Sequence, residues 1–171
     1  VVAHDVVAID IETYEASYLV MGHDPQRWAP ENRETADHSL PFTVATAWIT
    51  GGLPPDAYEP QRLSCATTRQ LMSRISVRAH EDLTREFPAM AQTRITVRDR
   101  HGDEFTHFQM NPKGNAGNPL SDAELETKFI NLFQHWGNET VARGVLEMLW
   151  SIDRLPQVRA LVDALCFEHK S

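Results

Sequence analysis

The residues best suited to chemistry are the three consecutive side chains of Asp37, His38 and Ser39. They stand directly before the apolar run from Leu40 to Thr50, which predicts a buried helix ended by two glycines. Asp37 or Ser39 could cap its first amides. A histidine beside an aspartate at a helix N-terminus could also hydrogen-bond the carboxylate of a ligand. The alternative is structural, with Asp37 as the cap and His38 filling space. Spacing alone favours the structural alternative, and both stay open.

The remaining candidates carry weaker signals. No two of the eight histidines have the i, i+4 spacing of a helical zinc pair, so we expect no metal. The loop from Asn111 to Pro119 lacks the Gly-Lys-Ser/Thr ending of a phosphate-binding loop. Cys65 and Cys166 are far apart in the sequence, which predicts reduced thiols rather than a disulfide framework. Cys166 continues the apolar stripe of the last helix and is expected in the core.

The composition predicts a folded protein without affinity for polyanions. The chain has 171 residues, of which 42% are hydrophobic and 23% charged, and its formal net charge is −8. This length suits one domain, or one domain with an appendage. The negative charge gives no electrostatic reason to bind nucleic acid or an anionic membrane. No apolar run approaches the roughly 20 residues of a membrane helix, and no signal peptide is visible. Together with the reduced thiols, these features predict a cytoplasmic location.

Alternating apolar and polar residues predict a small β-sheet in the first part of the chain. Strands are expected near residues 5–13, 74–79, 92–98 and 104–110. The run from Arg100 to Asp103 is typical of a turn and would join the last two strands into a hairpin. Helices are expected over residues 15–21 and 67–74. Residues 23–37 are polar, contain two prolines and are expected to form an ordered loop.

The last part of the chain predicts three helices. Ser121 and Glu124 form a capping box before an apolar stripe of helical spacing. Asn138 can cap a second helix, and Pro156 can open a third.

The order of these elements predicts the α+β class. An α+β domain would cover residues 1–119, and a helical tail would cover residues 120–171. The tail needs a surface on which to bury its apolar stripes. We therefore expect either a homodimer or helices folded back onto the sheet of the same chain.

Two motifs resemble the MmgE/PrpD family. The first runs from Asp24 to Pro30 and continues from Arg33 to Phe42, and the second runs from Asn118 to Phe129. The family includes 2-methylcitrate dehydratase, iminodisuccinate epimerase and cis-aconitate decarboxylase. Its members are longer than this chain, which resembles only their carboxy-terminal part, a lid followed by helices that return to a large helical domain. The first residue is Val1 rather than a methionine, which agrees with a fragment of a longer polypeptide.

The resemblance implies an enzyme that acts on a small di- or tricarboxylate without a metal or other cofactor. The family removes a proton from a carbon next to a carboxylate, at a site between its two domains. Several of its catalytic residues belong to the helical domain, so we assign no catalytic residue in this chain. The segment from His38 to Phe42 resembles the contribution of the lid. We therefore expect Asp37, His38, Ser39 and Phe42 to bind substrate.

The expected reaction is a lyase reaction, the dehydration of 2-methylcitrate in propionate catabolism, and the chain alone is expected to be inactive. One alternative keeps the family but changes the outcome to epimerisation or decarboxylation. The other is a non-catalytic domain that binds a ligand or a partner. Phe42 supports this second alternative. The family commonly has a tyrosine at this position, and phenylalanine lacks the hydroxyl group that tyrosine would donate.

Overall fold

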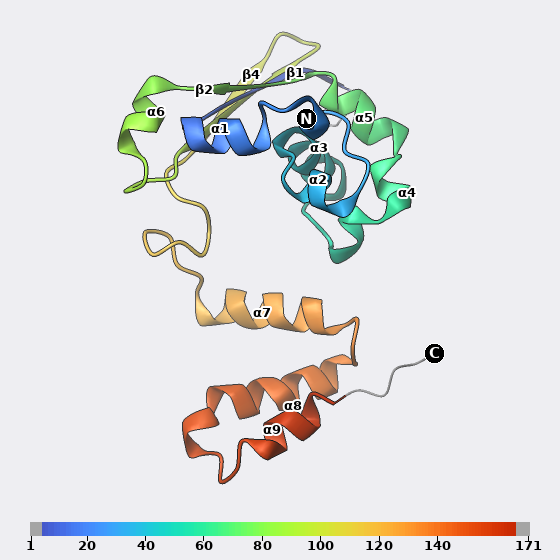
Figure 1. The fold of residues 1–171 in the computed structure, drawn as a ribbon, viewed down its shortest axis with the longest axis vertical. Helices are drawn as coiled ribbons and strands as arrows, with labels where there is room; N and C mark the ends of the chain where they lie inside the picture. Colours follow the sequence, from blue (N-terminus) through green and yellow to red (C-terminus); the bar gives the residue numbers. More distant parts are fainter. Residues whose placement is uncertain (1–4, 167–171) are drawn as a thin grey trace. The chain divides into compact units, whose positions relative to one another are not determined.

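A computed structural model describes residues 5–166. The chain divides into two compact units, Val1–Asn118 and Pro119–Ser171. The first contains a four-stranded sheet and several helices, and the second is helical throughout its described part (Figure 1). The predicted α+β class is therefore confirmed. No helix within residues 5–166 has the length and apolar character needed to span a bilayer.

The sheet of the first unit has the strand order β2-β1-β3-β4. Its strands are β1 (Val6–Thr13), β2 (Ile75–Ala79), β3 (Thr93–Asp99) and β4 (Glu104–Gln109). β1 pairs in parallel with β2 and antiparallel with β3, and β3 and β4 form an antiparallel hairpin. The four predicted strands are confirmed, because alternating apolar residues mark a strand with one buried face.

One face of this sheet is apolar and the other is polar. Ile9 and Ile11 of β1 are fully buried, and Ile9 lies opposite Ile75 on one side and Val97 on the other. The helices α1 (Glu15–Met21), α3 (Leu40–Thr50) and α5 (Ala66–Met72) lie on the same side of the sheet (Figure 1). The core forms between them, because period-two alternation places every second strand residue on that face.

The predicted loop over residues 23–37 is wrong. This segment contains a 3-10 turn, η2 (Pro25–Arg27), and a five-residue helix, α2 (Arg33–Asp37). Asn32 caps α2 in a capping box with Thr35, whose backbone amide lies 2.9 Å from the Asn32 side-chain oxygen. A helix this short has no periodic stripe to reveal it. Three further short elements were not predicted: η3 (Pro55–Tyr58), α4 (Pro60–Leu63) and α6 (Glu81–Glu86).

Ser39, rather than Asp37, caps the central helix α3. The Ser39 side chain accepts a hydrogen bond from the Phe42 amide, and Pro41 occupies the first turn as expected. Gly51 ends the helix in the left-handed region, at φ 76°, where a glycine is favoured. Of the two caps that the sequence allowed, Ser39 is confirmed, and Asp37 is instead the last residue of α2.

The second unit contains α7 (Asp122–Phe133), α8 (Glu139–Trp150), η4 (Ile152–Arg154) and α9 (Arg159–Ala164). The predicted capping box of Ser121 and Glu124 is confirmed, and so is the Asn138 cap. The third helix begins at Arg159 rather than at Pro156. The small core of the second unit is formed by residues Phe133, Ala142, Val145 and Leu161.

Many apolar side chains of the second unit stay exposed. Trp136 is 63% exposed and Val158 56%, and several other large apolar residues of the unit are more than two-fifths exposed. Cys166 is also exposed, so its expected place in the core is wrong. The third helix is too short for its stripe to reach that residue.

Replacing the buried cap of α3 should destabilise the first unit. We expect Ser39→Ala to lower the free energy of unfolding by about 1–2 kcal/mol, because it removes a helix cap and a buried hydroxyl bond. Urea unfolding followed by circular dichroism measures the change. The control is Ser73→Ala, whose exposed hydroxyl bonds only the Gln70 carbonyl and should matter by less than about 0.5 kcal/mol. Equal effects of the two substitutions would contradict this role for Ser39.

Candidate functional site

The predicted site residues lie where α2 ends and α3 begins. Asp37 is the last residue of α2, His38 is its C-cap, and Ser39 is the N-cap of α3. His38 therefore precedes the cap of the buried helix instead of opening it. The chain changes direction within these three residues, which places neighbouring side chains in very different environments.

Ser39 and Phe42 point into the core. Both are fully buried. The Ser39 hydroxyl donates to the Arg27 carbonyl and accepts from the Phe42 amide at 3.1 Å, so its hydrogen-bonding capacity is used within the fold. The Phe42 ring centroid lies 6.2 Å from that of Tyr58. These two residues fix the helix junction and hold its exposed neighbours in place.

Asp37 and His38 point outward and are hydrogen-bonded to each other. His38 Nδ1 lies 2.6 Å from Asp37 Oδ1 and 3.1 Å from the Glu34 carbonyl oxygen. Both neighbours are acceptors, so Nδ1 must carry a proton and donate. Nε2 is then the nitrogen that gains or loses a proton. The His38 side chain is 53% exposed, and both of its hydrogen bonds within residues 5–166 are made by Nδ1.

The same contacts favour the charged form of this histidine. The bond to the Glu34 carbonyl, followed by the bond to Asp37 and its negative charge, raises the pKa of His38 above its ordinary value. A protonated imidazole with Nδ1 fixed offers Nε2–H to an anion. Once deprotonated, the same nitrogen has a lone pair and can accept a proton. The pair can therefore bind a carboxylate or take part in proton transfer.

Two further residues lie beside this pair and were not singled out by the sequence. The Arg33 guanidinium lies 5.9 Å from the centroid of the Tyr58 ring. Burial and the charge of Asp37 raise the pKa of Tyr58, and Arg33 acts in the opposite direction. Arg33 lies within the motif that resembles the family, but Tyr58 comes from the distant element η3. Only the fold brings Tyr58 to Arg33.

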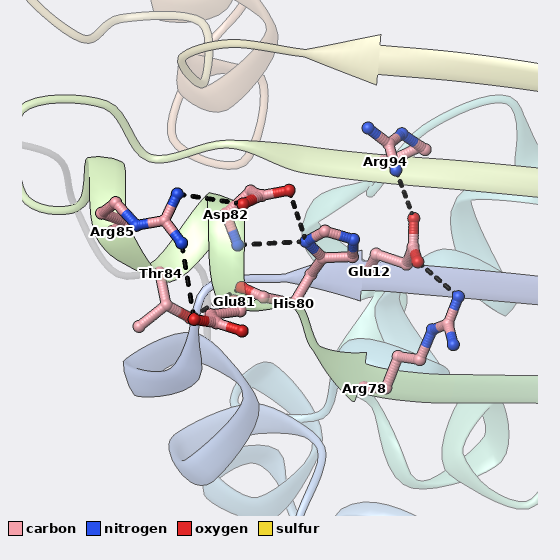
Figure 2. A network of polar contacts seen from close by, with 8 residues as sticks. All are labelled: Glu12, Arg78, His80, Glu81, Asp82, Thr84, Arg85 and Arg94. Carbon is pink, nitrogen blue, oxygen red and sulfur yellow. Dashed lines mark hydrogen bonds and ion pairs between the residues drawn. The ribbon is translucent and has the colours of Figure 1, made fainter.

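A second polar cluster lies on the open face of the sheet. Figure 2 shows the carboxylate of Glu12, on β1, between Arg78 of β2 and Arg94 of β3. Arg94 lies 2.7 Å from Glu12 Oε2, and Arg78 bonds Oε1. Two residues before Glu12 on the same strand, the Asp10 carboxylate accepts hydrogen bonds from Ser76 and Arg98, each at 2.6 Å. Each oxygen of the Glu12 carboxylate is bonded to an arginine of a neighbouring strand. We call this group of Glu12, Arg78 and Arg94 the Glu12 clamp, because it links three strands.

The charge of Glu12 is maintained by this clamp. The side chain is only 10% exposed. Burial raises the pKa of its carboxyl, but the hydrogen bonds and charges of Arg94 and Arg78 outweigh burial and hold the pKa below its ordinary value. The alternation of acidic and basic residues on the polar face could have suggested this pairing, but the sequence does not give the strand order that it requires.

The other residues in Figure 2 organise the start of α6. The His80 side chain accepts from the Asp82 amide at 3.2 Å, and the Thr84 hydroxyl donates to the His80 carbonyl. His80 therefore serves as a helix cap. Within residues 5–166, no group of three or more His, Cys, Asp or Glu side chains is arranged to hold a metal ion.

Comparison with models of known protein families identifies the family of this chain. Residues 2–154 match the model of the MmgE/PrpD C-terminal domain. The match covers most of the chain, so the protein belongs to the MmgE/PrpD family and corresponds to its carboxy-terminal domain. A search of curated proteins finds no match. The resemblance inferred from the two motifs is therefore confirmed at the level of the family.

The contacts of His38 predict a change that nuclear magnetic resonance can measure. We expect Asp37→Asn to lower the pKa of His38 while leaving it slightly raised, because the Glu34 carbonyl bond remains. In the wild type, the favourable contribution of the charged histidine is complete below pH of about 6.5 and is lost as the pH rises through the raised pKa. Asp103→Asn, in the turn between β3 and β4, serves as the control. An unchanged titration of His38 in Asp37→Asn would contradict the pairing.

The Glu12 clamp predicts an acid-dependent loss of stability. Because the folded pKa is lowered, the contribution of Glu12 is present above its unfolded pKa of about 4.3 and is lost as the pH falls through the folded value. We expect Glu12→Gln to cost about 1.5–3 kcal/mol at pH 7 and less at pH 3. Urea unfolding at both pH values measures this. The control is Glu86→Gln, an exposed residue of α6. A cost that does not shrink at pH 3 would count against the clamp.

Proposed function

We propose that this chain is the lid part of a metal-independent lyase that acts on a small di- or tricarboxylate. The observation that supports this best is the exposed His38 imidazole, whose Nδ1 is held by Asp37 and the Glu34 carbonyl. This arrangement leaves Nε2 to meet a ligand and favours the charge that a carboxylate prefers. Membership of the MmgE/PrpD family supports a substrate of this class.

In the proposed reaction, a base removes a proton from the carbon next to a carboxylate, and an acid gives a proton to the neighbouring hydroxyl, which leaves as water. Negative charge develops on the carboxylate oxygens as the proton departs, so a cation held at a fixed position lowers the barrier. His38 would supply that cation from the lid, with Asp37 as its positioning residue. Arg33, beside Tyr58, is a second cation of the same corner. The groups that move protons would lie on the helical domain of the family.

The first substrate to test is 2-methylcitrate, which would place the protein in propionate catabolism in the cytoplasm. Epimerisation or decarboxylation of a related acid remains the alternative outcome of the same proton abstraction. A purely ligand-binding role is the second candidate. It is favoured by Phe42, which is buried and carries no hydroxyl, so this position can offer substrate neither a proton nor a hydrogen bond.

The exposed apolar side chains of the second unit support a further part of the proposal. Val158 and Val162 of this unit are each more than half exposed, as is Trp136. A surface of this kind is rarely left uncovered. We propose that the helical domain of the family covers it in the complete enzyme. Residues 1–171 alone should then show negligible turnover.

The decisive experiment uses the longest natural polypeptide that contains these residues. It is assayed for dehydration of 2-methylcitrate and of related hydroxy acids, with proton exchange followed in deuterated solvent. We expect His38→Gln, which keeps a donor but loses the charge, to lower kcat/KM about tenfold to a hundredfold, with a fall in kcat as well as a rise in KM, because a charge-assisted bond is worth about 1.5–3 kcal/mol and strengthens as charge develops.

The matched control is His101→Gln, in the turn between β3 and β4, which should leave both constants unchanged. If His38→Gln behaves like this control, His38 does not bind substrate. Binding of the acids without exchange or turnover would favour the ligand-binding alternative. Robust dehydration by residues 1–171 alone would contradict the division of the active site between two domains.

A further inference from the structure

The Tyr58 hydroxyl is a polar group near the candidate site that the fold itself does not use. The ring of Tyr58 is partly buried and packs against the core of the first unit. Within residues 5–166, however, the hydroxyl forms no hydrogen bond to another residue, and its oxygen is not buried. A tyrosine hydroxyl can both donate and accept, so this group is available to a ligand.

Two neighbouring side chains hold the Tyr58 ring in place. Its centroid lies 6.2 Å from that of the fully buried Phe42 ring. The Arg33 guanidinium lies 5.9 Å from the same centroid, within the range of a cation–π contact. The preceding residue, Ala57, is fully buried and anchors η3 in the core. Because a tyrosine has only two side-chain torsions, a ring held in this way also fixes the direction of its hydroxyl.

Arg33 connects Tyr58 to the Asp37–His38 pair. Arg33 and Asp37 are four residues apart in α2, so their side chains lie on the same face of this helix. The element η3, which carries Tyr58, packs against α2. The fold therefore gathers the imidazole of His38, the carboxylate of Asp37 and the hydroxyl of Tyr58 at one corner of the first unit.

The surroundings of the Tyr58 hydroxyl keep it protonated. Burial, followed by the charge of Asp37, raises the pKa of Tyr58 above its ordinary value, and Arg33 opposes them more weakly. The hydroxyl is therefore a hydrogen-bond donor at neutral pH. Since the influence of Asp37 exceeds that of Arg33 at this position, a neutral oxygen is a better partner for the hydroxyl than a second anion.

We propose that Tyr58 is a specificity-determining residue, whose hydroxyl donates a hydrogen bond to the hydroxyl oxygen of a hydroxy acid while His38 holds a carboxylate of the same molecule. This inference rests on the proposed function, because it takes His38 as the residue that binds the carboxylate. It makes the substrate a hydroxy acid, and it therefore favours loss of water over the alternative outcomes of proton abstraction.

Asp37 can complete the recognition of the same group. Its bond to His38 uses Oδ1, and its side chain is 40% exposed. A ligand hydroxyl keeps its own hydrogen while it accepts from Tyr58, and the Asp37 carboxylate is a suitable acceptor for that hydrogen. An acid without the hydroxyl would leave both protein groups without a partner, which is how a polar site rejects an analogue.

The test compares two acids that differ in one group. They are 2-methylcitrate and its analogue in which a hydrogen atom replaces the hydroxyl. Stopped-flow titration of the longest natural polypeptide that contains these residues, completed before turnover, gives a Kd for each acid. We expect Tyr58→Phe to raise the Kd of 2-methylcitrate about threefold to tenfold and to leave that of the analogue unchanged, because only the first acid loses a hydrogen bond.

Two further variants serve as controls. His38→Gln should weaken the binding of both acids to the same extent, since both keep their carboxylates. Tyr14→Phe removes a hydroxyl from a ring that stacks on Phe87, with centroids 4.3 Å apart, and should change neither Kd. Urea unfolding should show Tyr58→Phe to be as stable as the wild type, because the lost hydroxyl has no partner within residues 5–166.

The outcomes separate this inference from the proposed function. If His38→Gln weakens both acids, but Tyr58→Phe weakens neither or weakens both equally, the role of Tyr58 is overturned and the proposed function stands. If His38→Gln changes neither Kd, the proposed function fails whatever the effect of Tyr58→Phe. A wild type that binds neither acid overturns both.

Discussion

The candidate site depends on the buried hydroxyl of Ser39. This group donates to the Arg27 carbonyl and caps α3, so it joins the segment before α2 to the central helix of the unit. With Ser39 held inward, Asp37 and His38 are left at the surface, where they bond to each other. A side chain that does no chemistry itself thus decides which of its neighbours can meet a ligand.

The sheet shows the same division between support and exposure. Its apolar face buries Ile9 and Ile11 beneath the helices, while its polar face carries the Glu12 clamp. The clamp links three strands through both oxygens of one carboxylate, and it therefore opposes slippage of β1 against its neighbours. β4 lies outside the clamp and forms one edge of the sheet in the described part of the chain.

The chain corresponds to the carboxy-terminal domain of the MmgE/PrpD family, and the proposed function divides the site between this domain and another. The charged corner at His38 is suited to hold a carboxylate, and its Asp37 partner fixes the tautomer that such a role needs. Acid–base chemistry on a carbon also needs a second group on the other side of the substrate. The proposed division between a lid and a helical domain satisfies that need.

The sequence by itself determined the four strands, the β3–β4 hairpin and the family, and it singled out Asp37 and His38 without predicting that they bond to each other. These features are local: period-two alternation marks a strand, and a contiguous motif survives without knowledge of the fold. The short helix α2 escaped, because five residues held by an Asn32 cap show no periodicity. Only the tertiary structure decided that Ser39 is the cap, that Tyr58 lies beside Arg33, and that Glu12 sits between two arginines. Each depends on which distant segments become neighbours, and strand order and helix packing are not written in local spacing.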